Sequence, residues 1–266
     1  MSADMLKQEL KRTFSQKNLY ISLAAFLFCL SGSSAQIWFV RAPTDAFLMS
    51  AMDLCFTPVF FGGTILLVPF CAAIACSQSQ VEEINSGNIQ FRILRCGYLR
   101  YSGGKLLSAV LAGFAALGGA FAVHTLLWHL VAGPYDIVSR PDVEVSFAEG
   151  TVYYDFIQQP WAYGAYLHAI FGFGLTGALW AVIGMLCAVL LADTMLSVSI
   201  PVVLYYLWKS NFTRYLFGFS LPDFTGLYND GVLWNEYWQN LAVHLALLAV
   251  FAAMYFTALK RRIRNA

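Results

Sequence analysis

Residues 81–107, VEEINSGNIQFRILRCGYLRYSGGKLL, form a charged, glycine-punctuated segment between two apolar runs of the chain. The flanking runs, Phe56–Ser77 and Leu106–Val131, are each long enough to cross a bilayer as a helix, which takes about 20 apolar residues. A polar segment between two such runs predicts a membrane protein whose chain leaves the bilayer here and returns to it. The segment is longer than a simple chain reversal requires, which indicates a surface that another molecule contacts.

The composition of the whole chain is also that of a membrane protein. Of its 266 residues, 59% are hydrophobic and 12% are charged, whereas soluble proteins contain roughly 45–50% apolar and about 25% charged residues. The formal net charge is +1 and no basic low-complexity tail is present, so no nucleic-acid partner is expected. The six cysteines form no CxxC pair and no zinc-type spacing, so neither a metal site nor a disulfide framework is expected.

Six apolar runs predict six transmembrane helices, because a backbone in lipid must satisfy its own hydrogen bonds. Five runs are continuous: Leu19–Val40, Phe56–Ser77, Leu106–Val131, Tyr163–Ala192 and Leu241–Leu259. The sixth, Met195–Ser220, is interrupted by Lys209 and Arg214. It follows the fourth run after a tight turn at Asp193. The predicted fold class is an all-α polytopic membrane protein, with residues 1–266 forming a single transmembrane domain.

Basic residues are concentrated in three segments, which predicts the topology. They lie before the first run, within 81–107 and after the last run, whereas most acidic residues lie in the segments between. Short loops rich in Lys and Arg stay on the cytoplasmic side. Both termini are therefore predicted to be cytoplasmic, in a membrane expected to be the bacterial cell membrane.

Residues 1–18 predict an amphipathic helix that lies at the membrane interface. Leu6, Leu10 and Phe14 recur every four positions, and basic residues occupy the other face. The alternative is a cleaved signal peptide. It is disfavoured because the first apolar run continues through Val40.

Two outer segments, 133–162 and 221–238, have distinct patterns. In the first, hydrophobic residues alternate on both sides of Gly150, from Val143 to Phe156, which predicts a small β-hairpin. A lid that only caps the helix ends is the alternative. The second contains Trp234 and Trp238 and is typical of an interfacial or re-entrant segment.

Small residues and prolines in the apolar runs predict how the helices pack. Glycines on the third and fourth runs indicate close helix contact; they are Gly113, Gly118, Gly172, Gly174, Gly177 and Gly184. Prolines indicate kinks or breaks in the second and fifth helices; they are Pro58, Pro69 and Pro201.

The sequence contains no recognisable catalytic motif. There is no HExxH, no GxSxG and no pair of carboxylates within an apolar run. Ser102–Lys105, SGGK, is not a Walker A motif, because Leu106 follows the lysine and a transmembrane helix begins there. The histidines, which all lie in apolar runs, are predicted to be neutral and bonded to neighbouring helices; they are His124, His129, His168 and His244. No enzyme activity and no metal site are expected in this chain.

Within 81–107, local signals predict a short helix over Asn88–Cys96. Ser86 can cap its beginning and Gly97 can supply the left-handed position after its end. An apolar stripe is expected from Ile89, Ile93 and Leu94. One interpretation is an interfacial helix on anionic lipid headgroups, and the other is a docking helix for a soluble partner.

The same segment resembles the loop after the second helix in the membrane subunits of ABC exporters of the type-two permease family. In order, the matching positions are Glu82, Glu83, Gly87, Arg92, Arg95, Tyr98, Leu99, Gly104 and Lys105. The resemblance extends to the amphipathic amino-terminal helix, the six spans with both ends inside and the aromatic segment before the last span. The long outer segment 134–161 departs from the family, which usually has a short connection there.

The resemblance implies that this chain is the permease subunit of an ATP-driven exporter. It implies a homodimer, or a heterodimer with a related permease, above two cytoplasmic ATPase subunits that bind ATP and Mg²⁺, so this chain itself needs no cofactor. The segment 81–105 would couple the two through Glu82, Glu83, Gly87, Asn88, Arg92 and Arg95. The substrate pathway would be lined by Phe60, Phe61, Tyr205, Tyr206 and Trp208, which favour an amphipathic, lipid-like or peptide cargo.

A second function remains open at the level of sequence. A membrane scaffold or ligand-binding protein would use the outer hairpin to bind its ligand, and the short helix would contact only lipid. A membrane-embedded enzyme is disfavoured because the catalytic groups described above are missing. Copurification with an ATPase chain distinguishes the permease from the scaffold.

Overall fold

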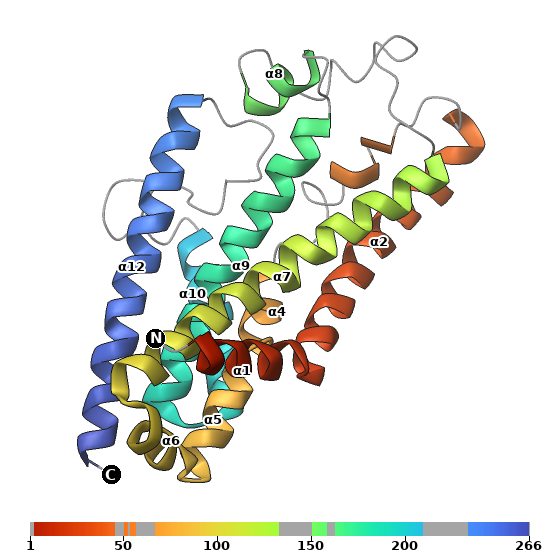
Figure 1. Ribbon diagram of the computed structural model, residues 1–266. Coiled ribbons are helices and arrows are strands. Elements are labelled where there is room, and N and C mark those ends of the chain that lie inside the picture. Colours follow the sequence, from red (N-terminus) through yellow and green to blue (C-terminus); the bar gives the residue numbers. More distant parts are fainter. Residues whose placement is uncertain are drawn as a thin grey trace.

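The computed structural model describes residues 3–45, 51–52, 54–56, 67–132, 151–158, 163–209 and 234–265, and nearly all of them are helical. The helices are α1 (Ala3–Phe14), α2 (Lys17–Asp45), α4 (Val68–Ile74), α5 (Ser77–Asn85), α6 (Asn88–Cys96), α7 (Tyr98–Ala132), α8 (Val152–Gln158), α9 (Tyr163–Leu191), α10 (Thr194–Lys209) and α12 (Trp234–Asn265). Long helices form a bundle, and the short α1, α5 and α6 lie at one end of it (Figure 1). The all-α fold class is confirmed.

Four helices in the described part of the chain are long and apolar enough to cross a membrane. They are Lys17–Gln36 within α2, Tyr98–Val131 within α7, Tyr163–Leu191 of α9 and Glu236–Arg264 within α12. These four correspond to predicted runs. The other two predicted spans are described only in part, as α4 with the start of α5 and as the shorter α10, because residues 57–66 and 210–220 lie outside the described residues.

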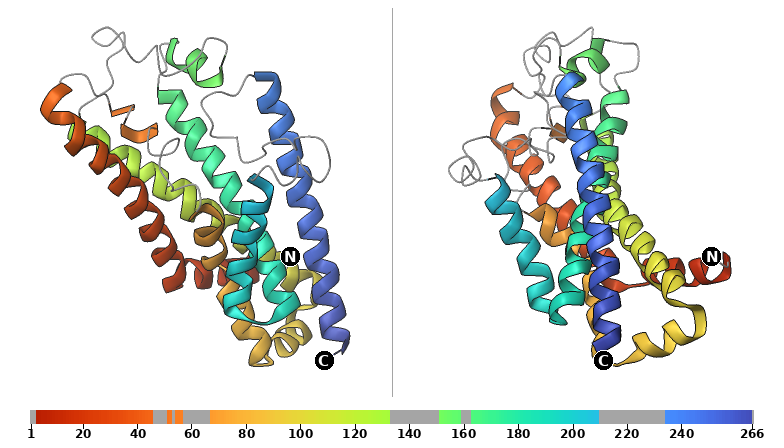
Figure 2. Two further views of the ribbon diagram at one scale, coloured as in Figure 1. Left: turned by 180° about the vertical axis from the view of Figure 1, so that it is seen from behind. Right: turned by 90° about the vertical axis from the view of Figure 1, so that its left-hand side faces the viewer.

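The central helix of the bundle is α9. It packs against α7, α12, α4, α10 and α5. In the apolar 18-residue stretch of α9, 83% is buried, whereas only 11% of the corresponding stretch of α12 is buried. The edge position of α12 is visible in Figure 2. Most of the apolar surface of α12 therefore faces outward.

Glycines allow α7 and α9 to approach closely, as the sequence predicted. A Cβ atom added to Gly177 would lie 2.2 Å from the carbonyl oxygen of Gly113. One added to Gly118 would lie 2.8 Å from the carbonyl oxygen of Ile170. Gly184 has the same role against α4, where an added Cβ would lie 2.9 Å from the Cβ of Ala73. Larger residues at these positions would force the helices apart.

The amino-terminal helix α1 lies across the end of the bundle (Figure 2). The prediction of a helix is confirmed, but the face that it turns to the bundle is polar. Glu9 and Thr13 are buried, whereas Phe14 is exposed. Phe14 is thus available to a membrane interface. The buried face of α1 makes the polar contacts described below.

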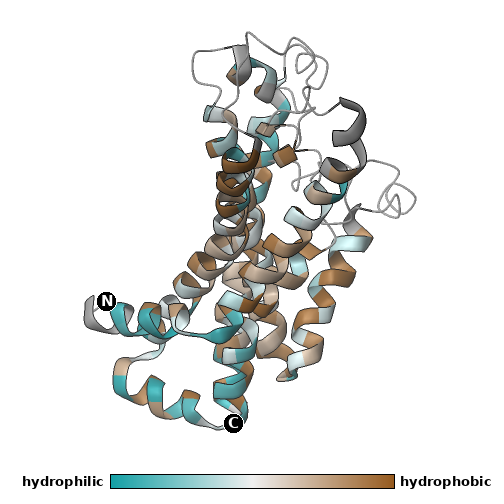
Figure 3. Ribbon diagram, turned by 90° about the vertical axis from the view of Figure 1, so that its right-hand side faces the viewer, coloured by the Kyte–Doolittle hydropathy of each residue, from teal (hydrophilic) through white to brown (hydrophobic). Residues whose placement is uncertain are grey.

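The three basic segments of the sequence come together in space. Hydrophilic residues of α1, α6 and the carboxyl end of α12 lie at one end of the molecule, away from the apolar middle (Figure 3). The turn between α9 and α10 is at this end too, since Asn85 Nδ2 donates a hydrogen bond to the carbonyl oxygen of Ala192 (3.2 Å). Asp193 in that turn caps α10, accepting a hydrogen bond from Leu196 N (2.8 Å). We refer to this part of the molecule as the basic end.

The predicted hairpin is wrong in its second half. Val152–Gln158 forms the helix α8, and Tyr154 N donates to the hydroxyl of Thr151 at its start (3.4 Å). Val152 and Phe156 pack in one cluster with Tyr237. A spacing of four residues suits one face of a helix as well as one face of a strand, which is why the alternation misled. Residues 133–150 and 159–162, with most of the second outer segment, lie outside the described residues.

Candidate functional site

The short helix α6 begins and ends where the sequence predicts, and glycines set both limits. Gly87 precedes it with φ 68° and Gly97 follows it with φ 83°, so both backbones lie in the region that favours glycine. The predicted cap was wrong: Gly87 occupies the N-cap position, and the Ser86 hydroxyl instead accepts a hydrogen bond from Asn88 Nδ2 (2.9 Å). The glycine turns on both sides therefore set where α6 begins and ends.

The buried carboxylate of Glu83 is the centre of a cluster of charged side chains. Lys105 Nζ donates to its Oε1 (2.7 Å), and the Arg12 guanidinium donates to the same oxygen. The Tyr101 hydroxyl donates to Oε2 (2.6 Å), and Arg92 Nη1 lies 3.2 Å from Oε1. Glu83 is 3% exposed, so these hydrogen bonds and ion pairs compensate for the hydration that its carboxylate loses on burial.

Glu9 supplies the second carboxylate of the cluster. Arg92 Nη1 donates to Glu9 Oε1 (2.7 Å), whereas Lys105 Nζ is 3.5 Å from Oε2. The contact between Lys105 Nζ and Glu9 Oε2 is purely ionic, because Oε2 has no hydrogen-bond partner in the described chain. The pKa of the Arg12 guanidinium is lowered, mainly because the group is partly buried and further because the positive charge of Arg92 lies nearby.

The charge cluster, Glu9, Arg12, Glu83, Arg92 and Lys105, joins four helices at the basic end. Its members come from α1, α5, α6 and α7, which are separate in sequence. Three cations face two carboxylates, so the formal charge of the cluster is +1. Arg92 is the member on α6, so a displacement of α6 alone would break its contacts with the buried carboxylates of Glu9 and Glu83. The cluster thus ties α6 to the amphipathic helix and to the start of a transmembrane helix.

The outer face of α6 is free of such contacts within the described chain. Phe91 is 66% exposed and Leu94 is 83% exposed, and the next residue, Arg95, is exposed as well. The predicted apolar stripe is therefore correct for the buried Ile89 and the half-buried Ile93 and wrong for Leu94. A cavity of about 270 Å³ lies beside the charge cluster, lined by Gln8, Glu9, Arg12, Arg92, Arg95, Cys96 and Tyr101.

The predicted coupling residues divide into two groups. Glu83 and Arg92 lie in the charge cluster, whereas the other four are exposed; they are Glu82, Gly87, Asn88 and Arg95. Adjacent Glu82 and Glu83 thus have opposite environments, because successive residues of a helix point about 100° apart.

The predicted pathway residues are not brought together in the described part of the chain. Tyr205 is buried against Trp180, with ring centroids 5.5 Å apart. The next residue, Tyr206, is exposed. Trp208 lies in α10, and Phe60 and Phe61 lie outside the described residues.

Sequence reasoning did not connect Glu9, Arg12 and Tyr101 with the site. The available signal was the rarity of charge in this chain: Glu9 is an acidic residue in a basic segment. Lys105 was recognised only as a family position, and the structure places it inside α7. The other residues of the SGGK stretch, Ser102–Gly104, are also helical.

Two of the histidines are bonded as predicted. His124 contacts the hydroxyl groups of Ser31 (3.1 Å) and Ser34 (3.4 Å) on α2. His244 Nε2 lies 2.9 Å from the carbonyl oxygen of Leu175 on α9. Among the residues that the structure describes, no group of three or more His, Cys, Asp or Glu side chains could hold a metal ion.

Comparison with known proteins identifies no family for this chain. No family model, no curated protein and no solved structure matches this chain. The four long apolar helices indicate a membrane-spanning helical protein. The function therefore has to be argued from the basic end itself.

Proposed function

We propose that this protein is the transmembrane permease subunit of an ATP-driven ABC exporter and that α6 is its coupling helix. The proposal includes six spans, both termini in the cytoplasm of a bacterial cell and a dimer of two permeases. ATP and Mg²⁺ are bound by separate ATPase subunits. The cargo is amphipathic, lipid-like or a peptide.

One observation carries this proposal: α6 is held on its inner side and open on its outer side. Arg92 contacts Glu9 on α1 and Glu83 on α5, while Phe91, Leu94 and Arg95 are exposed. Exposed apolar and arginine side chains are typical of protein interfaces. A partner that moves α6 therefore pulls on α1 and α5 through Arg92, and on the start of α7 through the contacts of Lys105 with the same two carboxylates.

The charge of the cluster also suits a protein partner. The net formal charge of +1 and the adjacent cavity lined by Arg12, Arg92 and Arg95 favour an acidic side chain of the ATPase. Such a residue would pair with guanidinium groups that are already oriented. The proposed docking surface therefore combines an apolar contact at Leu94 with an ionic contact at Arg95.

The test is copurification from the native membrane with charge-reversed variants. Arg95→Glu is expected to lower the recovery of a copurifying chain that carries a Walker A motif by at least tenfold. Lys260→Glu is the matched control, because Lys260 is an exposed basic residue at the same end but on α12. Absence of any nucleotide-binding chain, or equal retention by the two variants, would refute the proposal.

The scaffold alternative uses the same exposed face in another way. Phe91 and Leu94 next to Arg95 also suit insertion among lipid headgroups. In that case Leu94→Glu weakens insertion of α6 into vesicles, and no ATPase copurifies. In reconstituted vesicles, ATPase activity that rises with a candidate cargo supports the permease.

A further inference from the structure

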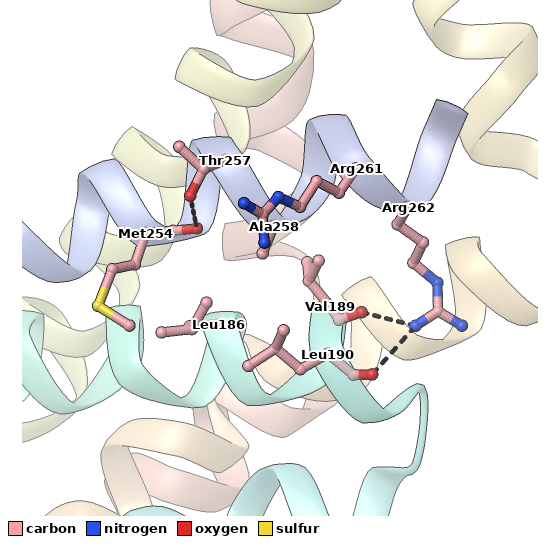
Figure 4. Close-up of a pocket in the computed structure, with 8 residues that line it drawn as sticks. All are labelled: Leu186, Val189, Leu190, Met254, Thr257, Ala258, Arg261 and Arg262. Atoms are coloured by element: carbon pink, nitrogen blue, oxygen red, sulfur yellow. Dashed lines mark hydrogen bonds between the residues drawn. The ribbon is translucent and has the colours of Figure 1, made fainter. Parts of the chain in front are cut away.

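A groove between the carboxyl ends of α9 and α12 lies at the basic end, outside the charge cluster. Its cavity volume is about 330 Å³, and it is lined by Leu186, Val189, Leu190, Met254, Thr257, Ala258, Arg261 and Arg262. Figure 4 shows these side chains between the two helices. Both helices are candidate membrane spans, so this groove opens where a span meets the membrane surface.

The two arginines of the groove have different roles. Arg262 Nη1 donates to the carbonyl oxygens of Val189 (2.6 Å) and Leu190 (3.4 Å), which satisfies the end of α9. Arg261 is exposed, and its side chain runs back along α12 beside Ala258 (Figure 4). No ion pair holds either arginine in the chain as described. Arg261 thus has donors available for a ligand, whereas Arg262 is used in packing.

The rest of the groove is apolar on the side that leads into the membrane. Leu190 is 58% exposed and Met254 is 46% exposed, and both lie in candidate membrane-spanning helices. Met254 precedes Arg261 by two turns, roughly 10 Å along the helix axis. A ligand that contacts both must therefore have an anionic group followed by a hydrocarbon chain.

We propose that this groove binds an anionic phospholipid, with the phosphate on Arg261 and an acyl chain along Leu190 and Met254. Charge complementarity favours this occupant, because Lys260 and Arg264 extend the positive charge around Arg261. The nearest acidic position in sequence to the groove, Asp193, already has its carboxylate committed to the start of α10. The guanidinium offers paired donors that match two phosphate oxygens. The proposal depends only on the membrane-spanning character of α9 and α12 and is independent of transport.

The experiment is native mass spectrometry of the full-length protein with added phosphatidylglycerol or phosphatidylcholine of the same acyl chains. The wild-type protein is expected to retain phosphatidylglycerol preferentially. Arg261→Ala should lower this retention about fivefold, the loss expected for one basic side chain near an anionic membrane surface. Arg264→Ala removes an equal charge outside the groove lining and should lower it less than twofold.

A second variant tests the acyl-chain part without changing charge. Leu190→Trp fills the groove and should also weaken retention of phosphatidylglycerol, while the elution volume and thermal unfolding confirm an intact fold. Equal losses in Arg261→Ala and Arg264→Ala would overturn the proposal in favour of non-specific attraction. Equal retention of the two lipids would overturn it too, as would competition by soluble glycerol phosphate at the lipid's own concentration.

Discussion

Replacement of Glu83 by glutamine should destabilise the protein strongly, although the side chain keeps its shape. Glu83 is buried and bonded to Arg12 and Lys105, with Arg92 at 3.2 Å. The substitution leaves three cations facing the single carboxylate of Glu9. Removing one partner of a buried ion pair costs about 3–5 kcal/mol. At about 2–4 °C for each kcal/mol in a chain of this size, the midpoint of thermal unfolding should fall by on the order of 10 °C.

The assay is temperature-dependent size-exclusion chromatography of the purified protein in detergent micelles. Glu82→Gln is the matched control, because it makes the same chemical change one residue away on an exposed side chain. Exposed substitutions usually change the free energy of unfolding by less than about 0.5 kcal/mol. The double variant Glu83→Gln/Lys105→Met removes the uncompensated lysine and should recover part of the loss. The reasoning fails if Glu83→Gln unfolds no earlier than Glu82→Gln.

Three further predictions follow from the packing and from α6. Gly177→Ala should lower the unfolding midpoint or prevent folding, since its Cβ would lie 2.2 Å from the Gly113 carbonyl oxygen, whereas Gly103→Ala, with no atom within 4 Å of the added Cβ, should not lower the midpoint, because Ala favours a helix over Gly. Gly87→Ala should weaken α6 by about 1–2 kcal/mol because its φ is 68°; faster amide exchange confined to α6 would confirm this, and unchanged exchange would contradict it. Burial raises the pKa of the Cys96 thiol, so less thiolate is present at neutral pH than for a free thiol. In a variant lacking the other cysteines, maleimide labelling at neutral pH should therefore be slower than for a free thiol, and an equal rate would refute the prediction.

Local features were predicted correctly where the physical cause is local. The limits of α6 follow from glycines at both ends, since only glycine adopts positive φ without strain. The long helices follow from the length of the apolar runs. Close packing of α7 on α9 followed from the glycines of the two helices.

The errors arose where local patterns allow two solutions. Val152 and Phe156 suit a strand or a helix, and packing against Tyr237 selects the helix. Ser86 was predicted to cap the start of α6, but Gly87 occupies the N-cap position. The positive φ of Gly87 places the turn there.

The sequence by itself determined that this is a helical membrane protein with a short, glycine-bounded helix among its basic segments. Those properties depend on composition and on contacts within a few residues. Only the tertiary structure decided that Glu83 is buried and Glu82 exposed, and that Glu9 and Lys105 meet across 96 positions of chain. A charged side chain is buried only where partners from other helices compensate its lost hydration, and that arrangement exists only once the helices have packed.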